Sequence, residues 1–134
     1  MAEQSTLILI KPDAVERGLV GAVLGRLEAK GLTIEKMEMR TMTDDLAAEH
    51  YAEHVERPFY PALKEFMTSA PLVALVASGD EAIPAVRALA GATDGRKADA
   101  GTIRGDYSLS NQRNLIHASD SPESAKREID LWFG

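Results

Sequence analysis

Apolar residues gather in four runs that predict strands. Residues 6–10 (TLILI) and 72–77 (LVALVA) are continuous apolar stretches of the length typical of buried strands. Residues 33–41 alternate apolar and charged side chains, which predicts a half-exposed strand. Residues 114–117 (NLIH) predict a short last strand. Helical patterns fill the intervals between these runs, so the sequence predicts a domain that mixes both kinds of element.

The first helical interval follows the first strand, which Lys11 and Pro12 end. Asp13 and Glu16 have the spacing of a capping pair at a helix start. Apolar residues then recur at i, i+3, i+4 and i+7, which predicts a helix that ends near Gly31. The residues of this apolar face are Val20, Val23, Leu24 and Leu27.

Further helices are predicted at residues 44–54, 63–67 and 83–90, and a last one begins with Ser121 as N-cap and Pro122 at its first position. The coarse order is β-α-β-α-β-α-β-α, or β-α-β-β-α-β if the mid-chain helices are an insertion. The second order is that of a ferredoxin-like α+β sandwich, a four-stranded antiparallel sheet covered by helices. The pattern alone leaves both orders open.

No sustained periodicity runs through residues 91–113. A stretch of this length is uncommon in a compact domain and is usually functional. From Arg87 to Arg113 there are five bases and three acids, a balance of +2, whereas the whole chain has a formal net charge of −6. An acidic protein with a locally basic segment suits a small anionic ligand.

Length and composition narrow the class of protein. A chain of 134 residues predicts a single domain, over residues 1–134, and its 45% hydrophobic and 27% charged residues are ordinary for a soluble globular protein. Cysteine is absent from the sequence, and no signal peptide or membrane-spanning stretch is visible, so we expect a cytoplasmic protein with no membrane partner. The acidic balance makes nucleic acid an unlikely partner. A nucleic-acid-binding module is therefore the less favoured alternative, also because an aromatic-rich RNA-binding strand is missing.

His117 is the first candidate for chemistry, because it lies where a predicted strand gives way to a helix. In the last helix, Glu128 shares a face with Ala125, Ile129 and Trp132. An inward carboxylate needs a partner, and a hydrogen bond to His117 would fix the tautomer of the imidazole and leave its other nitrogen nucleophilic. Ser119 could join this network.

Two hydrolytic interpretations compete with this one. Ser119, His117 and Asp120 are the residue types of a catalytic triad, but they are almost adjacent in the sequence and no G-x-S-x-G elbow accompanies them. The segment from His50 to His54 (HYAEH) matches the H-x-x-E-H zinc-protease signature. A solvated helix face explains that short match better, since only His117 is left as a third histidine ligand.

Phosphate-binding loops are missing from the sequence. Neither G-x-x-x-x-G-K-[ST] nor G-x-G-x-x-G occurs, so side chains would have to hold a bound anion. The cationic and neutral candidates are Lys11, Arg87, Arg104, Thr93 and Asn114. Together with a tautomer-locked histidine, they describe covalent phosphoryl transfer.

Four segments resemble the nucleoside diphosphate kinase family. They are residues 11–21 (KPDAVERGLVG), 50–63 (HYAEHVERPFYPAL), 100–107 (AGTIRGDY) and 114–133 (NLIHASDSPESAKREIDLWF). The resemblance covers essentially the whole chain, and the N-x-x-H-x-S-D-S core is its most specific part. It implies a ferredoxin-like core and a ping-pong reaction, in which a nucleoside triphosphate such as ATP phosphorylates a histidine and a nucleoside diphosphate then collects the phosphoryl group.

The resemblance also implies roles for individual residues. The active histidine would be His117, oriented by Ser119 and Glu128. Lys11 and Tyr51 would contact the terminal phosphate region. Phe59 would stack on the base and Leu63 would line its other side, which predicts broad acceptance of bases. The phosphates and the sugar edge would be held by Arg87, Thr93, Arg104 and Asn114.

The resemblance places Mg²⁺ on the nucleotide phosphates and gives the protein no metal-ligand cage. It leaves His50 and His54 as helix residues without a metal role. Gly95 and Ala100 stand where the family commonly has prolines, and Asn111 stands where it often has an apolar residue against the base. A homo-oligomer is expected, either a homotetramer or a homohexamer.

Overall fold

The computed structural model describes residues 3–134. Its elements, in chain order, are β1 (Glu3–Ile10), α1 (Pro12–Glu16), α2 (Val20–Ala29), β2 (Thr33–Arg40), α3 (Asp44–His50), α4 (Tyr60–Thr68), β3 (Leu72–Asp80), α5 (Ala82–Ala90), α6 (Ile103–Tyr107), β4 (Ile116–Ala118) and α7 (Pro122–Phe133). The strands form one sheet in the order β2-β3-β1-β4, and every neighbouring pair is antiparallel. The ferredoxin-like prediction is confirmed.

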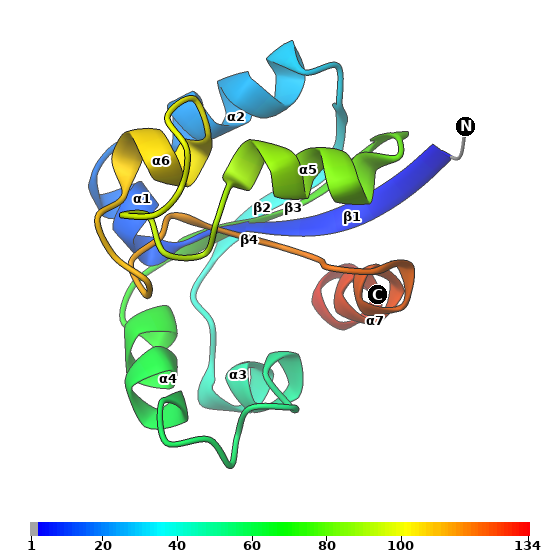
Figure 1. The fold of residues 1–134 in the computed structure, drawn as a ribbon. Helices are drawn as coiled ribbons and strands as arrows, with labels where there is room; N and C mark the ends of the chain where they lie inside the picture. Colours follow the sequence, from blue (N-terminus) through cyan, green and yellow to red (C-terminus); the bar gives the residue numbers. More distant parts are fainter. Residues whose placement is uncertain (1–2) are drawn as a thin grey trace.

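Helices cover both faces of this sheet (Figure 1). The central strand β1 explains why, because its second half, residues 7–10, is apolar on both sides. Ile8 and Ile10 pack in a buried cluster with residues of α1, α2, α5 and α6, whereas Leu7 and Leu9 pack in a second cluster with residues of α3, α4 and α7. Among residues 3–134, no helix is long and apolar enough to cross a membrane.

The capping pair predicted from Asp13 and Glu16 is wrong. Lys11 is the N-cap residue of α1, and its side chain makes no capping hydrogen bond. Asp13 is buried within the first turn, where its Oδ2 accepts a hydrogen bond from the backbone N–H of Leu115 at 3.2 Å. Its carboxylate therefore accepts a hydrogen bond from a distant segment and does not cap its own helix.

The helix predicted at residues 44–54 ends earlier than expected, at His50. Tyr51 leaves helical geometry with φ −101° and ψ 32°, and the backbone then continues through turns in which His54 N–H donates to the carbonyl of Tyr51 at 2.7 Å. As a result His50 and His54 do not share a helical face, and His54 is not a helix residue.

Two further boundaries differ from the sequence pattern. The last strand begins at Ile116, not at Asn114, because Leu115 has φ +75° and cannot continue a strand. Residues 91–113 contain the short helix α6, whose N-cap Thr102 accepts a hydrogen bond from Gly105 N–H. Five residues are too few to show a helical period in a sequence. At the other end of the chain, the predicted Ser121 cap is confirmed, since its side chain accepts from Ser124 N–H.

Candidate active site

The pairing of β4 with β1 decides which way His117 faces. His117 lies opposite Leu9 in the register of the two strands, and paired residues point to the same face of a sheet. Leu9 belongs to the cluster that α3, α4 and α7 cover. His117 therefore points toward the end of α3 and the inner face of α7, while its neighbours Ile116 and Ala118 pack in the opposite cluster.

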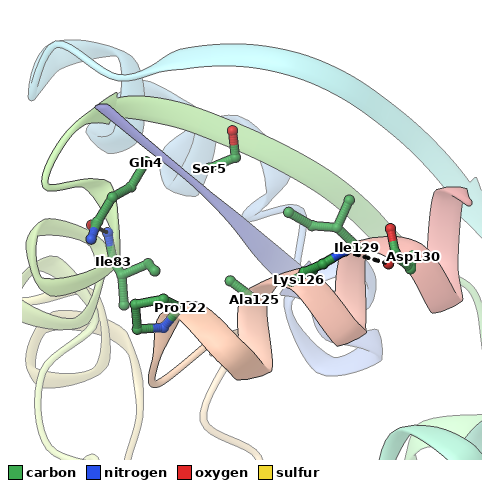
Figure 2. Close-up of a pocket in the computed structure, with 8 residues that line it drawn as sticks. All are labelled: Gln4, Ser5, Ile83, Pro122, Ala125, Lys126, Ile129 and Asp130. Atoms are coloured by element: carbon green, nitrogen blue, oxygen red, sulfur yellow. Dashed lines mark hydrogen bonds and ion pairs between the residues drawn. The ribbon is translucent and has the colours of Figure 1, made fainter. Parts of the chain in front are cut away.

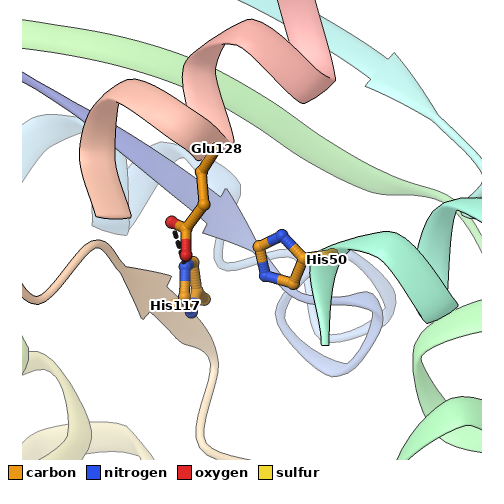
Figure 3. A group of neighbouring side chains, drawn as sticks. All are labelled: His50, His117 and Glu128. Atoms are coloured by element: carbon orange, nitrogen blue, oxygen red, sulfur yellow. Dashed lines mark hydrogen bonds and ion pairs between the residues drawn. The ribbon is translucent and has the colours of Figure 1, made fainter. Parts of the chain in front are cut away.

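Glu128 and Ser119 form a chain of hydrogen bonds behind His117. The Nε2 atom of His117 lies 2.9 Å from Oε1 of Glu128, and Ser119 Oγ donates to the same oxygen at 2.8 Å. A carboxylate only accepts, so Nε2 carries the proton and Nδ1 of the neutral ring keeps a free lone pair. In Figure 3 the second ring nitrogen points away from Glu128. The network predicted from the sequence is present in the structure.

The Glu128 carboxylate stays ionised although it is buried. Burial raises its pKa, but the hydrogen bonds from His117 and Ser119 help to bring the pKa below its usual range. An ionised acceptor binds the Nε2–H group more strongly than a neutral one. The histidine is thus held in one tautomer by a charge-assisted bond.

His50 forms a second support for His117. Its ring is buried and stands edge-on to the ring of His117, with the ring centres 4.7 Å apart. The indole N–H of Trp132 donates to Nδ1 of His50 at 3.1 Å, so Nε2 carries the proton of the neutral ring. Burial, and then the neighbouring His117, lowers the pKa of His50 to about 3, which keeps this ring uncharged at neutral pH.

Side-chain nitrogen and oxygen atoms of His50, His117 and Glu128 lie within 4.8 Å of one another (Figure 3). Hydrogen bonds already use one atom of each residue: Nδ1 of His50 accepts from the Trp132 indole, Nε2 of His117 donates to Glu128, and Oε1 of Glu128 accepts two hydrogen bonds. His54, the second histidine of the H-x-x-E-H match, lies against Phe59 instead, with the ring centres 5.5 Å apart. The group is better described as a hydrogen-bonded support than as a metal site.

A cavity of about 260 Å³ opens beside His117. Seven of the residues predicted for the site line it, namely Lys11, Tyr51, Phe59, Leu63, Thr93, Asn114 and His117. Phe59 is 52% exposed, so part of its ring is accessible for stacking. The cavity thus has an apolar part, made by Phe59 and Leu63, and a polar part that contains the histidine.

Lys11 is buried beside the histidine, and its Nζ donates to Oδ1 of Asn114 at 2.8 Å. Burial, followed by the charge of Arg104, lowers the Lys11 pKa to about 8. Tyr51 is also buried, and burial and then the Glu128 charge raise the pKa of its hydroxyl. Both side chains therefore lie in a poorly hydrated place, where a cation attracts a phosphate strongly.

Two predicted phosphate ligands lie outside the cavity that contains Lys11. Arg87 lines an adjoining hollow of about 220 Å³, together with His117 and Tyr51, and donates to the carbonyl of Ala118 at 3.1 Å. Arg104 holds three backbone carbonyls, those of Gly91 at 3.0 Å, Asn114 at 3.3 Å and Ile116 at 2.6 Å. Its pKa is lowered to about 10, by burial first and then by Arg87.

Two residues of the cavity were not predicted. His54 lines both hollows, and Gln112 lines the cavity of Lys11. The sequence offered a signal only for His54, which was considered as a metal ligand and not as a neighbour of Tyr51. Gln112 lies in the stretch without periodicity, where a lone polar residue gives no signal.

A larger hollow, of about 340 Å³, lies away from His117, between the start of β1 and α7 (Figure 2). Its lining residues are Gln4, Ser5, Ile83, Pro122, Ala125, Lys126, Ile129 and Asp130. Only Lys126 and Asp130 are charged, and they pair with each other at 3.6 Å. The chemistry of the described residues is thus concentrated at His117.

Comparison with known proteins shows which family the chain belongs to. The family model of nucleoside diphosphate kinase matches residues 4–134. The chain belongs to the nucleoside diphosphate kinase family. A nucleoside diphosphate kinase of Nocardioides sp. is 65% identical over 96% of this chain and 95% of its own length. One of Rhodococcus opacus is 63% identical over 97% of this chain and 94% of its own.

Solved structures of the nucleoside diphosphate kinase family share the fold. The halophilic enzyme of Halobacterium salinarum, solved in complex with CDP, has a TM-score of 0.96 at 45% identity and covers 98% of this chain and 88% of its own. The Aquifex aeolicus enzyme has a TM-score of 0.95 at 44% identity, over 99% of this chain and 96% of its own. The family consists of phosphotransferases, and its reaction is phosphoryl transfer between nucleotides.

Proposed function

We propose that this protein transfers the γ-phosphoryl group of a nucleoside triphosphate to a nucleoside diphosphate through His117. The observation that carries the proposal is the pair of hydrogen bonds at Glu128, which fixes the proton on Nε2 and leaves Nδ1 with its lone pair. Nδ1 attacks the γ-phosphorus. The bond between the γ-phosphorus and the oxygen that bridges the β- and γ-phosphates breaks, and the nucleoside diphosphate leaves. A terminal oxygen of the second diphosphate then attacks the phosphohistidine, and the N–P bond breaks.

Cationic and neutral donors around the histidine support this reaction. Lys11, Tyr51 and Asn114 would bind the phosphates from the cavity, and Thr93 lines the same space. Arg87 would act from the adjoining hollow. For Arg104 we propose a contribution through its charge and its hydrogen bonds to the carbonyls of Asn114 and Ile116, since it lines neither hollow. Such donors stabilise the negative charge that spreads over the transferred group.

The proposed nucleotide lies with its base on Phe59 and Leu63. Stacking on an aromatic ring accepts any base, and phosphate contacts ignore base identity. The exposed ring of Phe59 therefore supports broad tolerance of bases, and the proposal includes broad tolerance of sugars. The nucleoside diphosphate in the Halobacterium salinarum structure agrees with the same class of ligand.

We propose Mg²⁺ as the cofactor, carried by the nucleotide. The donor set fits this arrangement, because the cavity is lined by a lysine, hydroxyls, amides, rings and the aliphatic Leu63, without a carboxylate. Hard cations take oxygen ligands, which the nucleotide phosphates supply. When bound, the ion neutralises charge on the β- and γ-phosphates. Lys11 and Arg87 would then hold the remaining charge and orient the phosphates toward His117.

We also propose a homo-oligomer, a tetramer or a hexamer, of this single domain in the cytoplasm. Met37 and Met39 support self-association, because they lie on the outer strand β2 and are 54% and 59% exposed. They pair with Leu75 and Val73, so they extend the apolar face on which α2 and α5 pack. Light scattering gives the number of subunits, and a monomer would contradict the proposal.

Acceptor-free labelling tests the proposed function. We expect the protein to take up label from ATP labelled in the γ-phosphoryl group, in a form that is acid-labile and alkali-stable, and to release it on addition of GDP or CDP. The variant His117→Ala should take up none. His54→Gln is the matched control, since it removes the other histidine of the cavity and leaves the proposed nucleophile. Equal labelling of His117→Ala and wild type would contradict the assignment.

A further inference from the structure

The chain makes a strained turn two residues before His117. Leu115 has φ +75°, and the N–H of Ile116 donates to the carbonyl of Asn114 at 2.9 Å. A hydrogen bond from residue i+2 to residue i around a positive φ defines a γ-turn of the rare, strained kind. Leu115 is fully buried, so no solvent contact holds it in this conformation. Strain at a functional site persists only where the surroundings fix it.

The Lys11–Asp13 segment provides that fixation. Oδ2 of Asp13 accepts the hydrogen bond of Leu115 N–H at 3.2 Å, and the carbonyl of Leu115 accepts one from Lys11 N–H at 2.8 Å. Both polar backbone groups of the strained residue are therefore satisfied by one segment. Because Leu115 is buried, losing the carboxylate would leave its N–H group without a partner.

The γ-turn joins two parts of the candidate active site. On one side is Asn114, whose Oδ1 accepts from Lys11 Nζ. On the other side is β4, which carries His117 and pairs with β1 over only three residues. A change in the turn would move the partner of Lys11 and the histidine together.

Asp13 itself does not reach the proposed nucleotide. It lines a separate hollow with Glu16, Arg17 and Arg113, and it is absent from the lining of the cavity that contains His117. Its other oxygen, Oδ1, is buried and has no hydrogen-bond partner among the described residues. An unpaired carboxylate oxygen at this depth is costly, so shape alone does not explain why an acid is placed here.

The effect of its charge on Lys11 gives a second reason why an acid occupies position 13. Burial and the Arg104 charge lower the Lys11 pKa, whereas the Asp13 charge raises it. The other titratable groups around Lys11 are Tyr51 and His54 after α3 and His117 on β4, which line the same cavity, and His50 at the end of α3. Among these groups, Asp13 is the acid that favours the protonated lysine.

We propose that Asp13 is a positioning residue for phosphoryl transfer: its carboxylate holds the Leu115 turn that places Asn114 and His117, and its negative charge balances Lys11. This inference rests on the proposed function of His117. Asp13→Asn separates the two parts of the role, because an amide oxygen can still accept from Leu115 N–H but carries no charge. Asp13→Ala removes both.

The test measures the rate of acceptor-free labelling from pH 6 to pH 10. Glu16→Gln is the matched control, since it removes an exposed acid from the same helix without touching Leu115. We expect Asp13→Ala to label about tenfold to hundredfold more slowly at pH 7, as misplacement of a reacting group does. Asp13→Asn should label within about threefold of wild type at pH 7, because the acceptor is kept.

The pH profile separates positioning from a merely structural role. Loss of the Asp13 charge lowers the Lys11 pKa further, so the alkaline fall of the rate should begin at lower pH in Asp13→Asn than in wild type. Glu16→Gln should not move it, and Lys11→Arg should remove it in both backgrounds. An unmoved alkaline limb in Asp13→Asn, or wild-type labelling by Asp13→Ala, would overturn the inference.

Two outcomes are kept apart by this design. If Asp13→Ala fails to fold, as thermal unfolding would show, the dependence of the labelling rate on pH in Asp13→Asn tests the role of Asp13. If wild type itself takes up no label on His117, the proposed function has failed, and the inference about Asp13 that rests on it fails with it. If wild type is labelled on His117 but the alkaline fall of the labelling rate begins at the same pH in Asp13→Asn and wild type, only the role of Asp13 is contradicted.

Discussion

Trp132 donates its indole N–H to Nδ1 of His50 across 3.1 Å, although the two residues are 82 positions apart in the chain. This contact joins the end of α3 to the end of α7 directly behind His117, where the His50 ring stands edge-on to that of the histidine. The consequence is a neutral, oriented ring beside the proposed nucleophile, and it makes the stability of the fold dependent on pH.

His50→Gln should make stability less sensitive to acid. The His50 pKa falls from 6.5 to about 3 on folding, so below pH 6.5 the unfolded chain binds a proton that the folded protein excludes. The free energy of unfolding of wild type therefore falls as the pH drops from 6.5 toward 3. Glutamine keeps an acceptor for Trp132 but does not titrate. Urea denaturation at several pH values measures both proteins, and equal slopes over this range would contradict the prediction.

Glu128→Gln should slow phosphorylation of the protein more than Ser119→Ala. A glutamine amide can donate to Nε2 and so stabilise the wrong tautomer, for which we expect a loss of about hundredfold or more. Ser119→Ala removes one hydrogen bond to Oε1 of Glu128, and we expect about a fivefold loss, the equivalent of about 1 kcal/mol. Rapid-quench labelling gives both rates. A smaller effect for Glu128→Gln would mean that the carboxylate does not set the tautomer.

Phe59→Ala should weaken the binding of all nucleotides by similar factors. The ring is half exposed, so its removal leaves the core intact. Loss of a base-stacking contact is worth about 1–3 kcal/mol, whatever the base. The measurement is kcat/KM for GDP and CDP as acceptors, with Phe59→Tyr as the matched control that keeps the stack. A loss confined to one base would show that Phe59 discriminates between bases.

Gly95→Ala should destabilise the protein. A Cβ at this position would clash with the carbonyl oxygen of Ser108, and the N–H of Gly95 donates to the carbonyl of Ser110 at 3.1 Å. A proline at this position would also lose that hydrogen bond, because proline has no backbone N–H. We expect a loss of about 1–3 kcal/mol in the free energy of unfolding.

The matched control for Gly95 is Gly21→Ala in α2, where a Cβ would meet nothing within 4 Å. Alanine is the better helix former, so this variant should be more stable by up to about 1 kcal/mol. Denaturant midpoints decide between the two. Gly95→Ala at or above wild-type stability would show that the 91–113 segment relaxes around the added methyl group.

The sequence was sufficient for features that rest on period and on local chemistry. The continuous run of residues 6–10 is apolar on both sides because β1 lies at the centre of the sheet with helices on both faces. Glu128 could be placed because an inward carboxylate on an amphipathic helix needs a donor, and His117 was the nearest one. Ser121 followed from its capping position before Pro122.

Features that depend on tertiary contacts could not be predicted from the sequence. Asp13 has the spacing of a capping residue, but a backbone group 102 positions away takes its carboxylate. Nothing local marks Leu115 for a positive φ, since leucine rarely adopts one. Arg104 was selected for its charge alone, and its three bonds to carbonyls follow from the path of the 91–113 segment around β4.

The position of the phosphorus on the imidazole ring tests the central claim most directly. The ³¹P NMR spectrum of the phosphorylated protein, recorded after incubation with ATP, distinguishes a phosphoryl group on Nδ1 from one on Nε2. Because Nε2 of His117 donates to Glu128, the account predicts phosphorus on Nδ1 of His117 alone. Phosphorus on Nε2, or on a residue other than His117, would contradict it.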